Sequence, residues 1–330
     1  MGGSRQLMHP SRRSTLAFLG GLACVTPLPR SFAQTKPSSP TVRVAIISRT
    51  VFYAPLWAAQ AQHLFRDQGI HVAITVFDNA ELITQALKNG DIDIAISTPE
   101  SVMLDATSGG PLRMVAGNAE KLPHQIIARP HIHTAQDLIG ARFGVLSLKE
   151  GTAYLVKRYA ESMGLKPDQY TVLAVGGAPT RWKRLQEAEI DVGFQPFPLS
   201  YVAEASGYQN LGAISSLFPY WLFTSVNVHQ QWAQKNRDQL KQFLAVLNFA
   251  QRQITAKPQD FAGLMAQELQ TSPFFAERAL SQALSMQMFA PELRVYEPAV
   301  KAVFDALIDT EQIPPNSPFK LETFFDPSYL

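Results

Sequence analysis

Of the residues in this sequence that could perform chemistry, two aspartates at matching positions of a repeated segment look most like a catalytic pair. Asp93 lies in LKNGDIDIAIS, residues 87–97, and Asp191 lies in LQEAEIDVGFQ, residues 185–195. Paired carboxylates can perform acid–base chemistry on a substrate held between them. Each aspartate, however, begins an expected strand, and ligands of open α/β sheets bind beyond the opposite, carboxyl ends. We therefore expect both aspartates to turn the chain into a strand.

Other motifs that carry catalysis or bind metals are incomplete. His124, His131 and His133 are close in sequence, but no cluster of acids or cysteines stands beside them to complete a metal site. The chain has neither the Gly-X-Ser-X-Gly motif of hydrolases nor the Gly-Lys-Ser/Thr of a phosphate-binding loop. We therefore predict no catalytic residues, no metal and no cofactor.

Residues that follow expected strands are better placed to contact a ligand. In the first half of the chain, SRTVFYAP (residues 48–55) follows a buried strand and STPES (residues 97–101) follows another. Phe52 and Tyr53 are adjacent, so they cannot both face one core. At least one of these rings should face a cleft.

The segment STPES also contains the expected start of a helix. Thr98 is expected to cap this helix, with Pro99 at its first position and Glu100 in its first turn. Ser97 lies where the strand ends. Whether Thr98 and Glu100 contact a ligand or only begin the helix is left open.

Comparable residues follow the strands of the second half. Gly151 and Thr152 open a helix, and small residues there leave backbone N–H groups free for an anion. Gln195 ends another strand with an amide that can bond neutral or anionic groups. A cation for an anionic ligand is expected from Lys149, Arg49 or Arg181, each of which can equally be a solvated rim residue.

Alternating strand and helix patterns position these residues in two similar units. VRVAIIS, residues 42–48, begins an alternation that restarts after residue 130. This pattern predicts mainly parallel sheets with helices on both faces. After YWLFTSVNV, residues 220–228, only helical patterns follow, so we expect the tail to pack back on the first unit.

We therefore predict an α/β fold of two lobes that face each other across a cleft. Lobe one is expected to comprise residues 42–124 and 226–330, and lobe two residues 125–225. The chain crosses between them near residues 123–129 and 218–225, and two such crossings form a hinge.

The N-terminal residues 1–33 have the pattern of an export signal. LAFLGGLACV, residues 16–25, is an apolar core too short to span a membrane, and small residues predict cleavage before Gln34. SRRSTLA, residues 11–17, resembles a twin-arginine signal, so the export route is left open. Cys24 is an alternative lipidation site, and residues 34–41 form a polar linker.

The charge of the chain changes once this segment is set aside. It holds four arginines and no acid, so the formal net charge falls from +2 to −2. Nothing in that balance indicates a nucleic-acid or anionic-membrane surface. No later segment is apolar for long enough to span a membrane.

Three segments resemble the nitrate/sulfonate/taurine-type periplasmic substrate-binding proteins of ABC importers, a family that includes thiamine-pyrimidine binders. They are FYAPLWAAQAQHLFRDQGIHVAITVF (residues 52–77), ALKNGDIDIAISTPES (residues 86–101) and GVLSLKEGTAYLVKRYAESMGL (residues 144–165). The resemblance extends from Val42 to about Ile254. It implies a type II periplasmic-binding-protein fold that closes over one small molecule. By this resemblance the ligand would contact Phe52, Tyr53, Ser97, Thr98, Gly151, Thr152, Gln195 and Tyr220. The strand ends add Glu100 and Lys149 to these expected ligand-binding positions.

The resemblance favours a receptor over an enzyme. We expect a monomeric periplasmic protein that binds a small organic solute, such as a sulfonate, an aromatic acid or a pyrimidine, and delivers it to an inner-membrane permease. The alternative is an enzyme on the same scaffold, related to thiamine-pyrimidine synthesis. A branch that makes this pyrimidine uses iron and a cysteine-rich motif, whereas this chain has no cysteine after Gln34.

Overall fold

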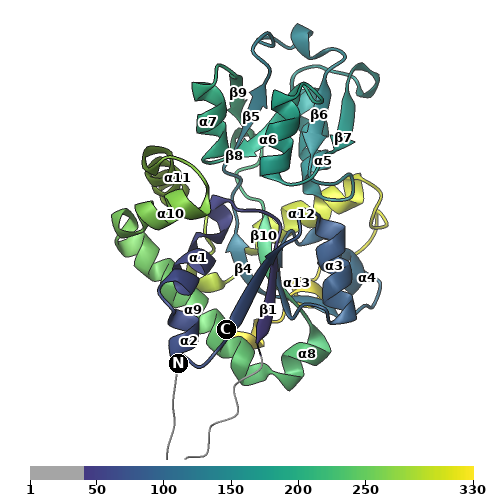
Figure 1. The fold of residues 1–330 in the computed structure, drawn as a ribbon. Coiled ribbons are helices and arrows are strands. Elements are labelled where there is room, and N and C mark those ends of the chain that lie inside the picture. The colour runs from purple at the N-terminus through teal and green to yellow at the C-terminus, as the bar shows by residue number, and fades with distance from the viewer. Residues whose placement is uncertain (1–40) are drawn as a thin grey trace, which may run out of the picture. The chain divides into compact units, whose positions relative to one another are not determined.

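The structure, a computed structural model, describes residues 41–330 and contains two five-stranded sheets (Figure 1). The predicted signal segment, its twin arginines, Cys24 and all but the last residue of the linker lie outside the described residues, and those predictions stay predictions.

The first sheet has the strand order β2-β1-β3-β10-β4. Its strands are β1 (Val42–Ile46), β2 (Val72–Val76), β3 (Ile94–Ser97), β4 (Leu112–Ala119) and β10 (Thr224–His229). β1 is parallel to β2 and β3, and β10 is antiparallel to β3 and β4. Four strands therefore run in one direction, and only β10 opposes them.

The second sheet repeats this arrangement with the order β7-β6-β8-β5-β9. Its strands are β5 (His124–Ala128), β6 (Arg142–Val145), β7 (Thr171–Ala174), β8 (Val192–Pro196) and β9 (Gln209–Ala213). β6 is parallel to β7 and β8, and β5 is antiparallel to β8 and β9. The predicted pair of mainly parallel sheets is confirmed, and the one opposing strand makes each sheet mixed.

Helices flank both sheets. Those between strands of the first sheet are α1 (Ala54–Ala61), α2 (Leu64–Asp67), α3 (Ala80–Asn89) and α4 (Glu100–Thr107). Those of the second are α5 (Gly151–Ser162), α6 (Ala178–Gln186) and α7 (Leu199–Ala205). α3 shows why these boundaries arise: the Asn79 side chain accepts a hydrogen bond from the Leu82 N–H (2.8 Å), and Gly90 ends the helix at φ 76°. α4 begins at Glu100 with Pro99 as its N-cap, one residue later than predicted.

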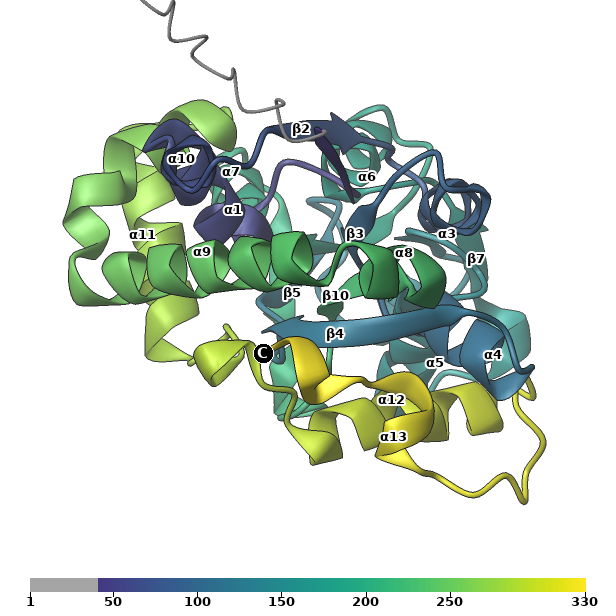
Figure 2. The same ribbon diagram turned by 90° about the horizontal axis from the view of Figure 1, so that it is seen from below.

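The C-terminal helices are α8 (Gln230–Lys235), α9 (Arg237–Ala256), α10 (Ala262–Glu268), α11 (Pro273–Ser285), α12 (Glu297–Asp309) and α13 (Leu321–Phe324). α9 lies beside α1 and α2, where Phe243 stacks on Phe65 with ring centroids 5.0 Å apart (Figure 2). The predicted packing of the tail on lobe one is therefore confirmed. α12 also contacts α5 of the second sheet.

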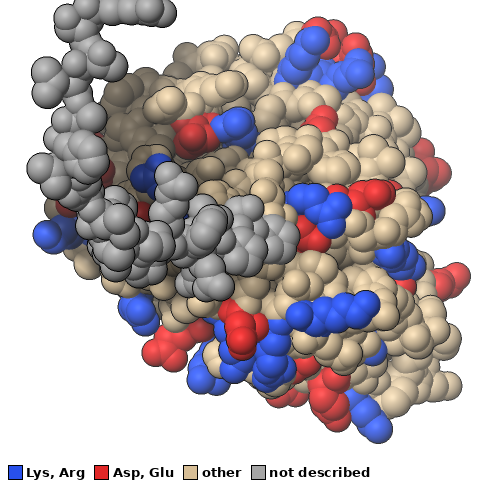
Figure 3. All heavy atoms as spheres, turned by 60° about the horizontal axis from the view of Figure 1, so that its bottom comes forward, with Lys and Arg blue, Asp and Glu red and all other residues tan. Residues whose placement is uncertain are grey.

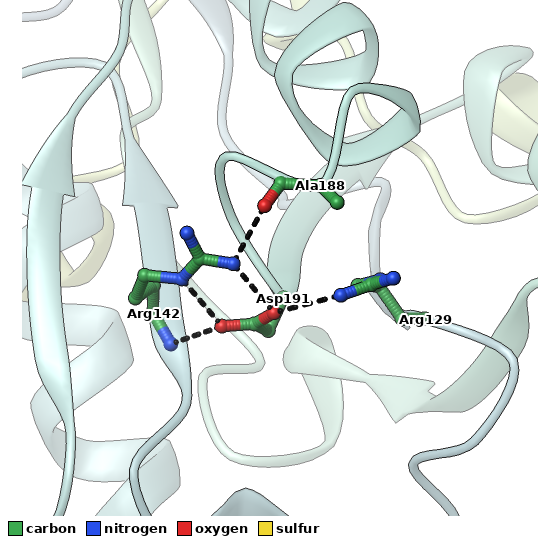
Figure 4. Close-up of polar contacts among 4 residues, drawn as sticks. All are labelled: Arg129, Arg142, Ala188 and Asp191. Atoms are coloured by element: carbon green, nitrogen blue, oxygen red, sulfur yellow. Dashed lines mark hydrogen bonds and ion pairs between the residues drawn. The ribbon is translucent and has the colours of Figure 1, made fainter.

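The two repeated aspartates form equivalent ion pairs at the starts of their strands. Asp191 accepts hydrogen bonds from the Arg142 backbone N–H (2.9 Å), from its Nε (2.8 Å) and from its Nη2 (2.9 Å) (Figure 4). Asp93 accepts the same three bonds from Arg43 at 2.8, 3.0 and 2.7 Å. Bidentate Arg–carboxylate pairs are directional, so each pair holds two neighbouring strands in register. Both aspartates lie at the strand starts, as expected.

Two crossovers connect the sheets. His124, which the predicted boundary assigns to lobe one, opens β5 of the second sheet, and Thr224 opens β10 of the first. We call the first sheet with its helices and the C-terminal helices lobe one, and the second sheet with its helices lobe two. The residue boundaries of the lobes remain a proposal.

The surface of the described part carries charges of both signs. On the face displayed in Figure 3, Lys and Arg side chains alternate with Asp and Glu, without a continuous patch of one sign. In residues 41–330, no helix combines the length and apolar character that a membrane crossing requires.

Candidate functional site

A small cavity lies between the lobes, beyond the carboxyl ends of several strands. Lobe one and the second crossover contribute Ile47, Ser48, Phe52, Tyr53 and Phe223. Lobe two contributes His124, Leu146, Thr152, Gly177, Ala178, Arg181 and Pro196. Its volume of about 20 Å³ holds about one water molecule. An organic molecule therefore enters only if the lobes separate or side chains move.

Three rings form one wall of this cavity. The Phe52 ring centroid lies 4.7 Å from that of Phe223 and 5.5 Å from that of His124, and the last two are 4.7 Å apart. Asn118 anchors the wall because its Nδ2 donates to the Phe52 carbonyl (3.0 Å). Such a wall favours a flat or apolar group on a ligand.

Tyr53 also lines the cavity, next to Phe52. Residues 51–53 form a single 3-10 turn, which lets two adjacent rings reach the same space. The Tyr53 hydroxyl accepts a hydrogen bond from the Ile47 N–H (3.3 Å), and burial raises its pKa. Tyr53 is therefore a neutral residue beside the wall.

Arg181 provides a buried positive charge. Its side chain is 3% exposed, and it donates from Nε and Nη2 to the Phe194 carbonyl (3.0 and 2.6 Å) and from Nη1 to the Gly176 carbonyl (3.1 Å). Burial lowers its pKa to about 10, so it is still protonated at neutral pH. No carboxylate among the described residues lies within ion-pair distance of it, although the charges of Glu150 and Asp78 counteract the lowering of its pKa. An anionic group on a ligand would add a direct ion-pair partner.

His124 is a neutral residue in the same cavity. Burial, and then the charge of Arg181, hold its pKa well below the ordinary value. Within residues 41–330 its Nδ1 has no hydrogen-bond partner. A neutral imidazole carries one donor and one acceptor nitrogen, so His124 can add a hydrogen bond to a ligand.

Carboxylates of lobe one contact the starts of two helices in lobe two. The Asp78 carboxylate accepts from the Gly177 N–H (2.7 Å) and the Thr180 hydroxyl (2.6 Å), where α6 begins. The Glu100 carboxylate accepts from the Gly151 N–H (3.0 Å), where α5 begins. Helix N-termini favour negative charge, so Asp78 stabilises the contact of α6 with lobe one in this closed arrangement, and the buried Glu100 adds a hydrogen bond at the start of α5.

Two buried glutamates meet at this boundary. Glu100 belongs to lobe one and Glu150 to lobe two, and their side chains are 2% and 4% exposed. Burial, and then the charge of Glu150, raise the pKa of Glu100 well above its ordinary value. Burial raises the pKa of Glu150 to about 7, although the Thr152 hydroxyl donates to it. Glu100 and Glu150 therefore bind protons more tightly when the lobes are closed than when they are separated.

The structure brings only some of the sequence-predicted residues together. Phe52, Tyr53 and Thr152 line the cavity. Seven others do not, and these are Ser97, Thr98, Glu100, Lys149, Gly151, Gln195 and Tyr220. Of the seven, Glu100 and Gly151 bond to each other across the lobe boundary, and Lys149 is exposed.

Ser97 and Gln195, two of the expected ligand contacts from opposite lobes, do not line the cavity in this arrangement. The Ser97 hydroxyl accepts from Asn227 Nδ2 (3.1 Å) inside lobe one. The Gln195 amide is fully buried in lobe two, where it can donate to the Ala178 carbonyl and accept from the Trp182 N–H, both at 3.2 Å. The hydrogen bonds of both side chains are therefore made within their own lobes.

Tyr220 is also placed differently from the expectation. Its ring is 45% exposed and lines a groove separate from the interlobe cavity. Sequence reasoning did not assign Phe223 or His124 to the cavity, and it left Arg181 open between cleft and rim. Phe223 directly precedes β10, and the start of β10 lies at the carboxyl ends of β3 and β4 only because β10 is antiparallel to them.

The histidines near β5 do not form a metal centre. His131 and His133 are exposed, whereas His124 is buried in the cavity. In the part of the chain that the structure describes, no group of three or more His, Cys, Asp or Glu residues is arranged to hold a metal ion.

Comparison with known proteins identifies a family. The family model described as NMT1/THI5 like matches residues 51–261. No curated protein sequence is significantly similar to the chain.

Solved structures show the same fold at low sequence identity. The ligand-binding component of an ABC-type import system from Staphylococcus aureus, solved with zinc bound, has a TM-score of 0.75 at 13% identity, over 88% of this chain and 98% of that one. The alkanesulfonate-binding protein SsuA from Xanthomonas axonopodis pv. citri, bound to MOPS, has a TM-score of 0.69 at 18% identity, over 84% and 95%. The periplasmic nitrate-binding protein NrtA from Synechocystis PCC 6803 has a TM-score of 0.72 at 12% identity, over 88% and 86%. The predicted periplasmic-binding-protein fold is therefore confirmed.

Proposed function

The chain belongs to the NMT1/THI5-like family, and from this premise we propose that it is the extracytoplasmic solute receptor of an ABC importer. Solved neighbours described as ABC-import or periplasmic binding proteins support this proposal. In this function the protein works as a monomer in the periplasm, and it delivers its solute to a permease of the inner membrane.

We further propose that the solute is a small organic anion with a flat or apolar part. The observation that carries this proposal is the buried guanidinium of Arg181, which lines the same cavity as the aromatic wall and has no carboxylate within ion-pair distance among the described residues. An aromatic carboxylate or a sulfonate combines both features. The ligand would favour closure because it contacts Phe52 from lobe one and Arg181 from lobe two only when the lobes approach.

Ligand-induced stabilisation tests this proposal. The full chain is screened by thermal shift with benzoate, MOPS, nitrate and an aminopyrimidine. A ligand present at about 100 times its dissociation constant adds about 2.7 kcal/mol to the free energy of unfolding. We expect benzoate or MOPS, but not nitrate, to raise the melting temperature.

Substitution of Arg181 then links binding to the cavity. Arg181→Met should weaken binding of the active anion about 10-fold to 100-fold, because a hydrogen bond to a charged group contributes about 1.5–3 kcal/mol. Arg181→Lys keeps the charge and should retain part of the affinity. Arg158→Met removes an exposed arginine of α5 and is the matched control. Unchanged affinity in folded Arg181→Met, or binding of the aminopyrimidine alone, would refute an anion site.

The buried glutamates favour a second candidate function, an enzyme related to thiamine-pyrimidine synthesis. Glu100 and Glu150 have raised pKa values at the lobe boundary, as acid–base residues of active sites often do. An enzyme predicts turnover of a pyrimidine precursor, with loss of turnover in Glu150→Gln. If the precursor binds reversibly and no product forms over time, the result supports the receptor instead.

A further inference from the structure

A second and larger cavity lies behind the hinge, and we call it the hinge groove. Its volume is about 720 Å³, which is within the range of small-molecule sites. The crossovers contribute Glu120, Lys121 and Tyr220, α9 contributes Asn248 and Gln251, and Tyr296 precedes α12. None of the residues that line it also lines the interlobe cavity.

Two residues that line this groove have a buried side-chain oxygen without a donor among the described residues. Gln251 is 7% exposed, and its Nε2 donates to the Ala290 carbonyl (2.8 Å), which fixes the amide orientation. Its Oε1 is left without a partner, as is the buried Oδ1 of Asn248, three residues earlier on α9. A buried acceptor without a donor costs about 1–3 kcal/mol. A ligand that donates N–H bonds would remove this cost.

Glu120 adds a buried carboxylate. It is 6% exposed, and one carboxylate oxygen accepts from the Tyr296 N–H. Burial raises its pKa to about 7. Its backbone carbonyl accepts from the Trp221 N–H (3.1 Å), and its backbone N–H donates to the Met288 carbonyl (2.8 Å). Glu120 therefore connects both crossovers to the C-terminal helices.

Aromatic faces complete the groove. The Tyr220 and Tyr296 ring centroids lie 4.9 Å apart, and the two rings are 45% and 44% exposed. The Lys121 Nζ lies 5.8 Å from the Tyr220 ring centroid, so this ring already attracts a cation. Arg252 and Glu292, of opposite charge, line the groove as exposed residues. The buried polar atoms of these lining residues that have no partner are acceptors, and the one buried charged side chain among them is an acid.

We propose that the hinge groove is a second ligand site, and that it takes a small organic ammonium ion with an aromatic or apolar tail. The ammonium group donates to Gln251, Asn248 and Glu120, and the tail packs on Tyr220 and Tyr296. The occupant is a free small molecule, because the acceptors are buried and the volume suits one. This site is independent of the solute proposed for the interlobe cavity.

Binding of benzylammonium to the full chain tests this proposal. The neutral analogue benzyl alcohol is its matched control. We expect saturation-transfer NMR and titration calorimetry to detect benzylammonium at millimolar concentration in the groove and to detect no benzyl alcohol there. Arg181→Met should leave benzylammonium binding unchanged, which separates this site from the interlobe cavity.

Substitutions in the groove decide where the ammonium binds. Tyr220→Ala and Glu120→Gln should each weaken binding about tenfold, an amount equal to about 1.4 kcal/mol. Tyr220 is half-exposed, so its replacement leaves the fold intact. Phe249→Ala removes a ring of α9 with the same exposure, 44%, outside the groove, and should change nothing.

Three results would overturn the proposal. The first is no binding of benzylammonium to folded protein at millimolar concentration. The second is binding that neither Tyr220→Ala nor Glu120→Gln weakens. The third is a self-associated protein in sedimentation velocity that Tyr220→Ala converts to a monomer, because the groove would then be covered by a second copy of the chain.

Discussion

Replacement of Asp78 by Asn should shift the protein from the closed to the open arrangement. Asp78 in lobe one accepts hydrogen bonds from the Gly177 N–H (2.7 Å) and the Thr180 hydroxyl (2.6 Å) at the start of α6 in lobe two. Asn has the same shape but no charge. The substitution therefore removes the charge that favours the helix N-terminus and leaves the packing intact.

The expected magnitude follows from these two contacts. A hydrogen bond to a charged group contributes about 1.5–3 kcal/mol and a neutral one about 1 kcal/mol, so each bond loses about 1 kcal/mol. The substitution also removes the interaction with the helix dipole, which is about 0.3–1 kcal/mol. Solvent screens the half-buried Asp78, so this second contribution lies at the low end of that range. A net loss of about 2 kcal/mol raises the ratio of open to closed molecules about 30-fold, since 1.4 kcal/mol is about tenfold.

Single-molecule energy transfer between the lobes measures this ratio. Arg66→Cys in lobe one and Asp168→Cys in lobe two are exposed labelling positions, in a Cys24→Ser background without other cysteines. Without solute, Asp78→Asn should increase the population with low transfer efficiency. Asp67→Asn, which neutralises an exposed acid of α2, is the control and should leave the distribution unchanged.

Two results would refute the reasoning. In one, Asp78→Asn has the same distribution as the unmodified protein at neutral pH. In the other, Asp67→Asn shifts the distribution by as much as Asp78→Asn does. The shift would then result from the change in net charge rather than from the lost contacts at the start of α6.

Three further predictions concern the lobe boundary and the strand pairs. The closed form should be favoured in acid, because it binds more protons than the open form. Its population should fall as pH rises from about 4.5, the ordinary pKa of an exposed glutamate, through about 7, the raised pKa of Glu150. Energy transfer measured from acid to neutral pH should fall accordingly, and Glu150→Gln should reduce this dependence on pH. Gly151→Ala places a Cβ 2.5 Å from Glu100 Oε1, so it should block closure and weaken solute binding in calorimetry, whereas Gly263→Ala has open space and should do neither. Arg142→Met should lower the free energy of unfolding by about 2 kcal/mol in urea, because it removes both side-chain hydrogen bonds of Arg142 to the half-buried Asp191 and leaves only the longer ion pair with Arg129 (3.5 Å). A change below about 0.5 kcal/mol would contradict a structural role for this pair.

The fold was predictable because its determinants are local. Strand and helix alternation, the glycine after α3 and the aspartates that begin β3 and β8 depend on neighbours within a few residues. The arginine partners of these aspartates, Arg43 and Arg142, were not predicted, since they lie 50 and 49 residues away. Pairing of strands, rather than any local pattern, brings them together.

The sequence by itself determined the two α/β units, the helical tail and the aromatic residues that follow β1. Only the tertiary structure decided which side chains meet in the cavity, because Phe52, Arg181 and Phe223 come from segments far apart in the chain. It also decided that Gln195 and Ser97 bond within their own lobes. The physical reason is that burial and hydrogen-bond partners are set by neighbours in space: packing buries Arg181, and its donors bond the carbonyls of Gly176 and Phe194, the latter 13 residues away in the chain.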